Sequence, residues 1–216
     1  MSIAIFVGPT FPFGQINEYL HIPATIFPPI KRGDIEMLAA DHEVIVIIDG
    51  VFHSTLSVSA REILLALKEK TIYGCSSMGA LRAAELDKFG MIGVGEVYKM
   101  YSDRRIVSDG EVALLFDPVT YENMTVPLVN VRFALTQAVK NEVINQTTSD
   151  YLLTIASKIH YTELDYLSVI KNANQDTNKT NYDALMEYLS LNIDNLDLKK
   201  KDALELIGKL NFSFKS

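Results

Sequence analysis

Several residue types are scarce in this chain of 216 residues. One cysteine, Cys75, excludes an internal disulfide bond and a zinc site built on several cysteines. The four histidines show no H-x-x-x-H or related spacing of metal ligands. The chain has 20 basic and 27 acidic residues, and the net charge of −7 argues against non-specific nucleic-acid binding. We therefore expect no metal and no nucleic-acid partner.

Long apolar runs and nucleotide-binding motifs are also missing. The apolar run at residues 3–7 is too short for a signal or a membrane span and is typical of a buried strand. The order of Gly90, Gly93 and Gly95 does not match a dinucleotide fingerprint, and no G-x-x-x-x-G-K-[ST] occurs. We therefore expect a cytoplasmic protein with no cofactor and no membrane partner.

What is present divides into two regimes. Up to about residue 125, strand-like and helix-like segments alternate, which indicates an α/β fold. Continuous β-branched runs such as residues 44–48 favour a mostly parallel sheet that helices cover on both faces. The expected strands are 3–7, 24–27, 44–48, 71–73 and 111–116, and the expected helices are 34–40, 59–68, 78–88 and 95–101.

The second regime is helical. Apolar residues recur at helical spacing in 128–144, 151–159, 164–170 and about 197–210. Thr162 and Thr180 have the spacing of helix caps. The sequence thus predicts an α/β core at 1–126 and a helical C-terminal region at 127–216 packed on it. The run Lys199–Lys201 is interpreted as a solvated helix face, with a docking patch for an acidic partner as the alternative.

Four loops are expected to converge at the carboxyl ends of the strands, where ligands bind in open parallel sheets. They comprise residues 8–10, 28–34, 49–50 and 74–79, and each is rich in glycine or proline. The last of these loops is the most informative, because its small residues join a strand to a run of residues that strongly favour a helix.

Ser77 is the candidate nucleophile of this turn. The pattern Cys75-x-Ser77-x-Gly79 departs from the G-x-S-x-G nucleophile elbow by one small residue. The N–H groups of Met78 and Gly79 would lie at a helix N-terminus and could stabilise an oxyanion. The alternative is that Ser76 or Ser77 merely caps the helix.

Other residues compete for roles at this site. Cys75 is a rival nucleophile, although isolated cysteines are usually buried small hydrophobes. A serine needs a proton acceptor: Lys31 is the only lysine in the converging loops, and His53 follows the third expected strand closely enough to reach the same rim. For each of them, a surface loop position is the alternative.

Substrate contacts are expected from Thr10, Asp49, Arg82 and Glu85. Arg82 and Glu85 lie three residues apart and share a helix face, so they either pair with each other or bind a carboxylate-bearing ligand. Asp49 ends an apolar strand, either as a rim residue or as the cap of the next turn.

Several motifs, taken in order, resemble the TfuA-like family over about residues 3 to 135. The motif that best carries the resemblance is G-C-S-S-M-G-A-L-R-A-A-E-L at residues 74–86. The others are I-F-V-G-P-T at 5–10, D-G-V-F at 49–52, F-G-M-I-G-V-G at 89–95, D-G-E-V-A-L-L at 109–115 and V-N-V-R at 129–132.

The resemblance implies a partner of a YcaO enzyme in thioamidation of peptide backbones, within the biosynthesis of modified ribosomal peptides (RiPPs). The implied activity is hydrolysis of a thiocarboxylated, ubiquitin-like sulfur carrier of the ThiS type, which supplies sulfide. The family's site is described as a serine–lysine pair, which fits Ser77. Arg61 stands where some relatives have lysine, so the catalytic lysine is either replaced, for example by Lys31, or missing. Phe116 stands where histidine is frequent.

Two other functions are compatible with these residues. One is a noncatalytic adaptor that docks the YcaO enzyme, the peptide substrate and the sulfur carrier. The other is a serine hydrolase that acts on small esters.

Overall fold

The computed structural model describes residues 2–52, 56–174 and 182–214. Within them, five strands form one parallel sheet in the order β2-β1-β3-β4-β5. The strands are β1 (Ile3–Phe6), β2 (Thr25–Phe27), β3 (Val44–Ile47), β4 (Thr71–Cys75) and β5 (Ile92–Val94). The predicted α/β fold, with a mostly parallel sheet and a helical C-terminal region, is confirmed.

Helices and short 3-10 helices (η) connect and follow these strands. They are η1 (Pro12–Glu18), α1 (Asp34–Leu38), α2 (Ala60–Ala66), α3 (Met78–Leu86), η2 (Asp87–Phe89), α4 (Glu96–Ser102), η3 (Asp109–Glu111), α5 (Leu128–Lys140), α6 (Gln146–Ala156), α7 (Tyr166–Ala173), α8 (Asp183–Leu191), η4 (Ile193–Leu196) and α9 (Leu198–Ser213). Among the described helices, none combines the length and apolar character needed to cross a membrane.

Both faces of the sheet are buried, because successive strand residues point to opposite faces. Ala4, Phe6, Ile45 and Ile47 pack on one face with apolar side chains of α1, α2 and α3. The neighbouring residues in each strand pack on the other face against η1 and α9. Burial of the strands on both faces therefore explains the continuous apolar runs of the sequence, as predicted.

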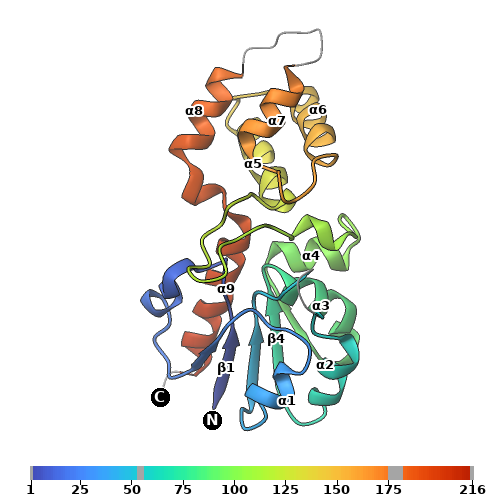
Figure 1. Ribbon diagram of the computed structural model, residues 1–216, viewed down its shortest axis with the longest axis vertical. Helices are drawn as coiled ribbons and strands as arrows, with labels where there is room; N and C mark the ends of the chain where they lie inside the picture. The colour runs from blue at the N-terminus through green and yellow to red at the C-terminus, as the bar shows by residue number, and fades with distance from the viewer. Residues whose placement is uncertain (1, 53–55, 175–181, 215–216) are drawn as a thin grey trace. The chain divides into compact units, whose positions relative to one another are not determined.

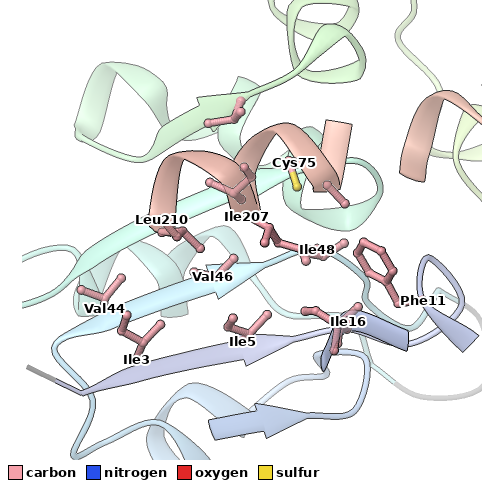
Figure 2. Packing of buried hydrophobic residues seen from close by; sticks show 14 of the residues in the cluster. Ile3, Ile5, Phe11, Ile16, Val44, Val46, Ile48, Cys75, Ile207 and Leu210 are labelled. Atoms are coloured by element: carbon pink, nitrogen blue, oxygen red, sulfur yellow. The ribbon is translucent and has the colours of Figure 1, made fainter. Parts of the chain in front are cut away.

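The helix α9 covers the second face through a regular apolar stripe. Its Ala203, Leu206, Ile207 and Leu210 are buried together with Val46 of β3 and other residues of β1 and β3. Figure 2 shows Ile207 and Leu210 above Val44, Val46 and Ile3. A segment near the C-terminal end of the chain thus completes the core of the N-terminal sheet.

By contacts, the described chain forms two compact units. Unit 1 comprises Met1–Asp109, Pro118–Glu122 and Lys199–Ser216, and so includes the sheet and nearly all of α9. Unit 2 comprises Gly110–Asp117 and Asn123–Leu198. Figure 1 shows the helices α5 to α8 of unit 2 grouped together. They bury a separate apolar core that includes Leu135, Leu152 and Leu185.

One predicted strand is wrong, and one observed strand was not predicted. Residues 111–116 form no strand: Glu111 ends η3, and only an isolated bridge joins Phe116 to Asn123. The sheet edge is instead β5, a three-residue strand that pairs with β4. An apolar run cannot show where it will be buried, and glycines beside β5 hide its strand character.

The cap predicted at Thr162 is also wrong. The helix α7 begins at Tyr166, and Asp165 is its N-cap. Asp165 accepts a hydrogen bond from the N–H of Ser168, whose hydroxyl accepts one from the N–H of Asp165. This reciprocal capping box satisfies two amide groups at the start of the helix. Thr180 lies outside the described residues.

Glu111 and Arg132 form a two-armed ion pair in unit 2. The Glu111 carboxylate is buried and accepts hydrogen bonds from Nε and Nη2 of Arg132 at 2.9 and 2.8 Å. This pair joins the segment 110–117 to α5. Two of the motifs quoted above, at residues 109–115 and 129–132, are therefore joined by an ion pair.

The start of α4 is capped by a residue from α9. Gly95 is the N-cap of α4 but has no side chain, and Asp202 instead accepts hydrogen bonds from the N–H groups of Glu96 and Val97 at 2.9 and 2.7 Å. Burial raises the pKa of Asp202 to about 7, while these two hydrogen bonds oppose the shift. A Cβ on Gly95 would overlap the Asp202 carboxyl group.

Gly95→Ala should destabilise unit 1 more than Gly90→Ala. Both glycines have positive φ, which costs an alanine about 1 kcal/mol. At Gly90 a Cβ meets no atom within 4 Å, whereas at Gly95 it displaces the cap of α4, so we expect a loss above about 2 kcal/mol. Urea unfolding measures both; equal losses would contradict the cap.

Arg132→Met should lower the free energy of unfolding of unit 2 by about 2 kcal/mol. It leaves the buried Glu111 carboxylate without its partner. The matched control is Arg105→Met, since Arg105 pairs with Glu96 and Asp103 at an exposed position where ion pairs contribute little. Chemical denaturation of both variants tests this, and similar losses would show that burial of the pair is unimportant.

Candidate functional site

The four loops predicted to converge lie together in unit 1. The strands β2 and β3 lie on opposite sides of β1, so the order of the sheet reverses at β1 and a crevice is expected at its carboxyl end. The loop after β1 bonds to Asp49, and Ile30 of the loop after β2 donates its N–H to the carbonyl of Asp49. The turn after β4 contacts the loop after β1 through Ser76.

Asp49 lies at the centre of this arrangement. Its side chain is 1% exposed and accepts hydrogen bonds from the N–H groups of Gly8 and Thr10 at 3.0 and 2.9 Å. It also accepts one from the Thr10 hydroxyl at 2.8 Å. The Nζ atom of Lys199 lies 4.0 Å from Oδ1. We call Thr10, Asp49, Ser76 and Lys199 the Asp49 cluster.

Ser76 occupies the turn between β4 and α3 in an unusual backbone conformation. Its φ is +67°, and the N–H of Ser77 donates to the carbonyl of Cys75 at 2.8 Å, which closes a γ-turn around Ser76. A non-glycine residue with positive φ is uncommon, and such strain is concentrated at functional sites. The Ser76 Oγ lies 3.2 Å from the Thr10 Oγ1.

Ser77 follows directly as the N-cap of α3. Its side chain makes no capping hydrogen bond to the helix, so the capping alternative does not account for this hydroxyl. Ser77 is nearly buried, at 2% exposure. Of the two amides predicted to face an oxyanion, that of Gly79 donates to the carbonyl of Ile48 at 3.3 Å, while Met78 provides the first amide of α3.

Lys199 is the residue of this site that sequence reasoning missed. The interpretation of Lys199–Lys201 as a solvated face is wrong for Lys199, which is 2% exposed, although Lys201 is exposed. The sequence does contain a signal. Extending the buried stripe of α9 one turn back from Ala203 leads to Lys199.

A family model of the TfuA-like protein matches residues 49–164. This is more than half of the chain. The chain belongs to the TfuA-like family. A comparison with curated proteins finds no match. The matched range includes Asp49 and the turn with both serines, whereas Thr10 and Lys199 lie outside it.

Other predicted residues of this TfuA-like protein are exposed or lie outside the described residues. Lys31 is exposed, and its main-chain N–H donates to Asp34. Arg61 is exposed at the start of α2. His53 lies outside the described residues. The role of Lys31 as a proton acceptor therefore stays a prediction.

Arg82 and Glu85 pair with each other, which is one of the two alternatives weighed from the sequence. Nη1 of Arg82 lies 2.6 Å from Oε2 of Glu85, and its Nε donates to the carbonyl of Val58 at 3.0 Å. In this member of the TfuA-like family, the Arg82–Val58 hydrogen bond connects α3 to the segment before α2. A role in binding substrate stays a prediction for both residues.

Cys75 ends β4, is completely buried and shares an apolar cluster with side chains of α9 such as Ile207 (Figure 2). Burial raises the pKa of its thiol well above the ordinary value, and the carboxylates of Asp202, Asp49 and Glu205 raise it further. A thiol must ionise to act as a nucleophile. The structure thus supports the interpretation of Cys75 as a core residue of the TfuA-like fold.

Cys75 of the native TfuA-like protein should resist alkylation by iodoacetamide at pH 8. The thiol should react only when urea unfolds the sheet, because burial both blocks access and suppresses the thiolate. Mass spectrometry of timed samples measures the labelling. Rapid modification under native conditions would restore Cys75 as a candidate nucleophile.

Proposed function

We propose that this TfuA-like protein hydrolyses the C-terminal thiocarboxylate of a ubiquitin-fold sulfur carrier of the ThiS type. The sulfide would pass to a YcaO enzyme that forms thioamides in a peptide backbone. Family membership supports the pathway. The observation that carries the chemistry is the strained Ser76 turn, whose hydroxyl contacts a buried Thr10–Asp49–Lys199 group.

The nucleophile of this proposal is a serine of the turn. Ser77 is the choice from the sequence, and its hydroxyl is not used as a helix cap. Ser76 is the choice from the backbone, because it has the positive φ of a nucleophile elbow and its hydroxyl is oriented by Thr10. We favour Ser76 and keep Ser77 as the alternative.

The reaction would proceed through an acyl-enzyme. The serine Oγ forms a bond to the thiocarboxylate carbon, and the amide of Met78 faces the resulting oxyanion. The C–S bond then breaks, and sulfur leaves as hydrosulfide with the proton that the serine has lost. Water hydrolyses the ester to a carboxylate and restores the serine. No oxidant or reductant is needed.

The resemblance also implies a lysine, and Lys199 is the buried candidate. Its amine lies beside Asp49 as the cation of an ion pair, so it would stabilise the negative charge of the thiocarboxylate and its oxyanion. Lys31 is the other candidate, from the loop after β2. Arg82 and Glu85 complete the proposal as substrate contacts.

A noncatalytic adaptor is the second candidate function. One observation favours it: both serines are at most 2% exposed, so substrate would reach them only if neighbouring groups moved. As an adaptor, the protein would dock the YcaO enzyme, the peptide and the sulfur carrier without chemistry at the serine turn.

Sulfide release from a thiocarboxylated carrier tests the hydrolase. The Ser76→Ala variant should lose at least about 100-fold in kcat, as expected when a nucleophile is removed. Ser77→Ala should retain most activity, and the matched control Ser190→Ala, on the exposed face of α8, should match the wild type.

The outcomes separate the alternatives. Loss confined to Ser77→Ala would assign the nucleophile to Ser77. Absence of sulfide release by the wild type would contradict the hydrolase. If that protein still increased the binding of peptide to the YcaO enzyme, the adaptor would be favoured.

A further inference from the structure

We infer that Thr10 and Asp49 form a proton relay for Ser76 rather than contacts for the substrate. This inference rests on the proposed serine chemistry and names two residues that assist it. The geometry is a continuous series of contacts: Ser76 Oγ to Thr10 Oγ1 at 3.2 Å, and Thr10 Oγ1 to Asp49 Oδ1 at 2.8 Å.

The chemistry of the three groups determines the direction of these hydrogen bonds. An ionised carboxylate only accepts, so the single hydroxyl proton of Thr10 points to Asp49. Thr10 is then left with lone pairs toward Ser76, and the Ser76 hydroxyl must be the donor between them. The Ser76 proton is therefore held toward Thr10, and the remaining lone pairs of its Oγ are directed elsewhere.

Burial and charge explain why Asp49 binds groups of the protein and not the substrate. Its carboxylate is 1% exposed, and its oxygens accept bonds from Gly8 N–H, Thr10 N–H and the Thr10 hydroxyl. Lys199 Nζ compensates its charge at 4.0 Å, as a buried carboxylate requires. An acceptor so occupied has little capacity left for a ligand.

The relay carries one proton from Ser76 to Asp49 without a cofactor. As the Ser76 Oγ bonds to the carbonyl carbon, its proton passes to Thr10 Oγ1 and the Thr10 proton passes to Asp49 Oδ1. Asp49 becomes neutral and the new oxyanion takes up the negative charge, so the total charge beside Lys199 is unchanged. When the C–S bond breaks, Asp49 returns its proton to Thr10 Oγ1, and the Thr10 hydroxyl gives its own proton to the departing sulfur instead of to Ser76, which is now an ester.

Thr10→Val and Thr10→Ser test the relay in the full chain. Valine keeps the size of threonine but lacks the hydroxyl, whereas serine keeps it. The probe is a fluorophosphonate, from which a reactive serine displaces fluoride irrespective of the natural substrate. We expect labelling of Ser76 to slow on the order of 100-fold in Thr10→Val, the usual contribution of a positioned proton acceptor, and to recover within about threefold in Thr10→Ser.

Steady-state sulfide release supplies a second readout. Thr10→Val should lower kcat with little change in KM if Thr10 serves proton transfer, whereas a substrate contact would raise KM. Thr154→Val is the matched control, because its hydroxyl lies exposed on α6. Urea unfolding shows whether Thr10→Val is folded, and rescue in Thr10→Ser separates relay from loop structure.

The outcomes distinguish this inference from the function on which it rests. Labelled Ser76 without sulfide release would overturn the proposed substrate and leave the relay standing. Thr10→Val labelled as fast as the wild type, or a wild type not labelled at Ser76, would overturn the relay.

Discussion

The buried carboxylate of Asp49 is the group around which the candidate site is organised. A charge so far from water is tolerated only when its oxygens are hydrogen-bonded and its charge is compensated. The loop after β1 provides the hydrogen bonds, and Lys199 of α9 provides the opposite charge. Because Thr10 also contacts Ser76, the same group holds the turn after β4. Three separate segments of the chain are thus held together by one side chain at the end of β3.

The helix α9 has a comparable double role. Its apolar stripe covers one face of the sheet, and its N-terminal part continues that stripe with two buried polar residues, Lys199 and Asp202. Lys199 pairs with Asp49, and Asp202 caps α4. The apolar packing sets the position of α9 on the sheet, and it therefore places both polar side chains. This explains how a residue far along the chain from the serine turn belongs to the same site.

Much of the fold could be predicted because its signals are local. Buried parallel strands appear as continuous apolar runs, and β1, β2, β3 and β4 were expected within two residues of their observed ends. The run at 111–116 failed because Val112 and Ala113 are buried without strand pairing, after Glu111 has ended η3 and paired with Arg132, while Leu115 is exposed. The strand β5 was missed because its pairing with β4, rather than its composition, makes it a strand.

The sequence by itself determined the α/β class, the family and the small-residue turn that presents two adjacent serines, since hydrophobic periodicity and turn chemistry are properties of neighbouring residues. Only the tertiary structure decided which serine has the strained backbone, and which lysine is buried beside Asp49. Lys31 lies in a converging loop but is exposed, whereas Lys199 lies in a charged run but is buried. The physical reason is that the packing of α9 on the sheet sets these positions, and that packing depends on contacts between segments distant in the chain.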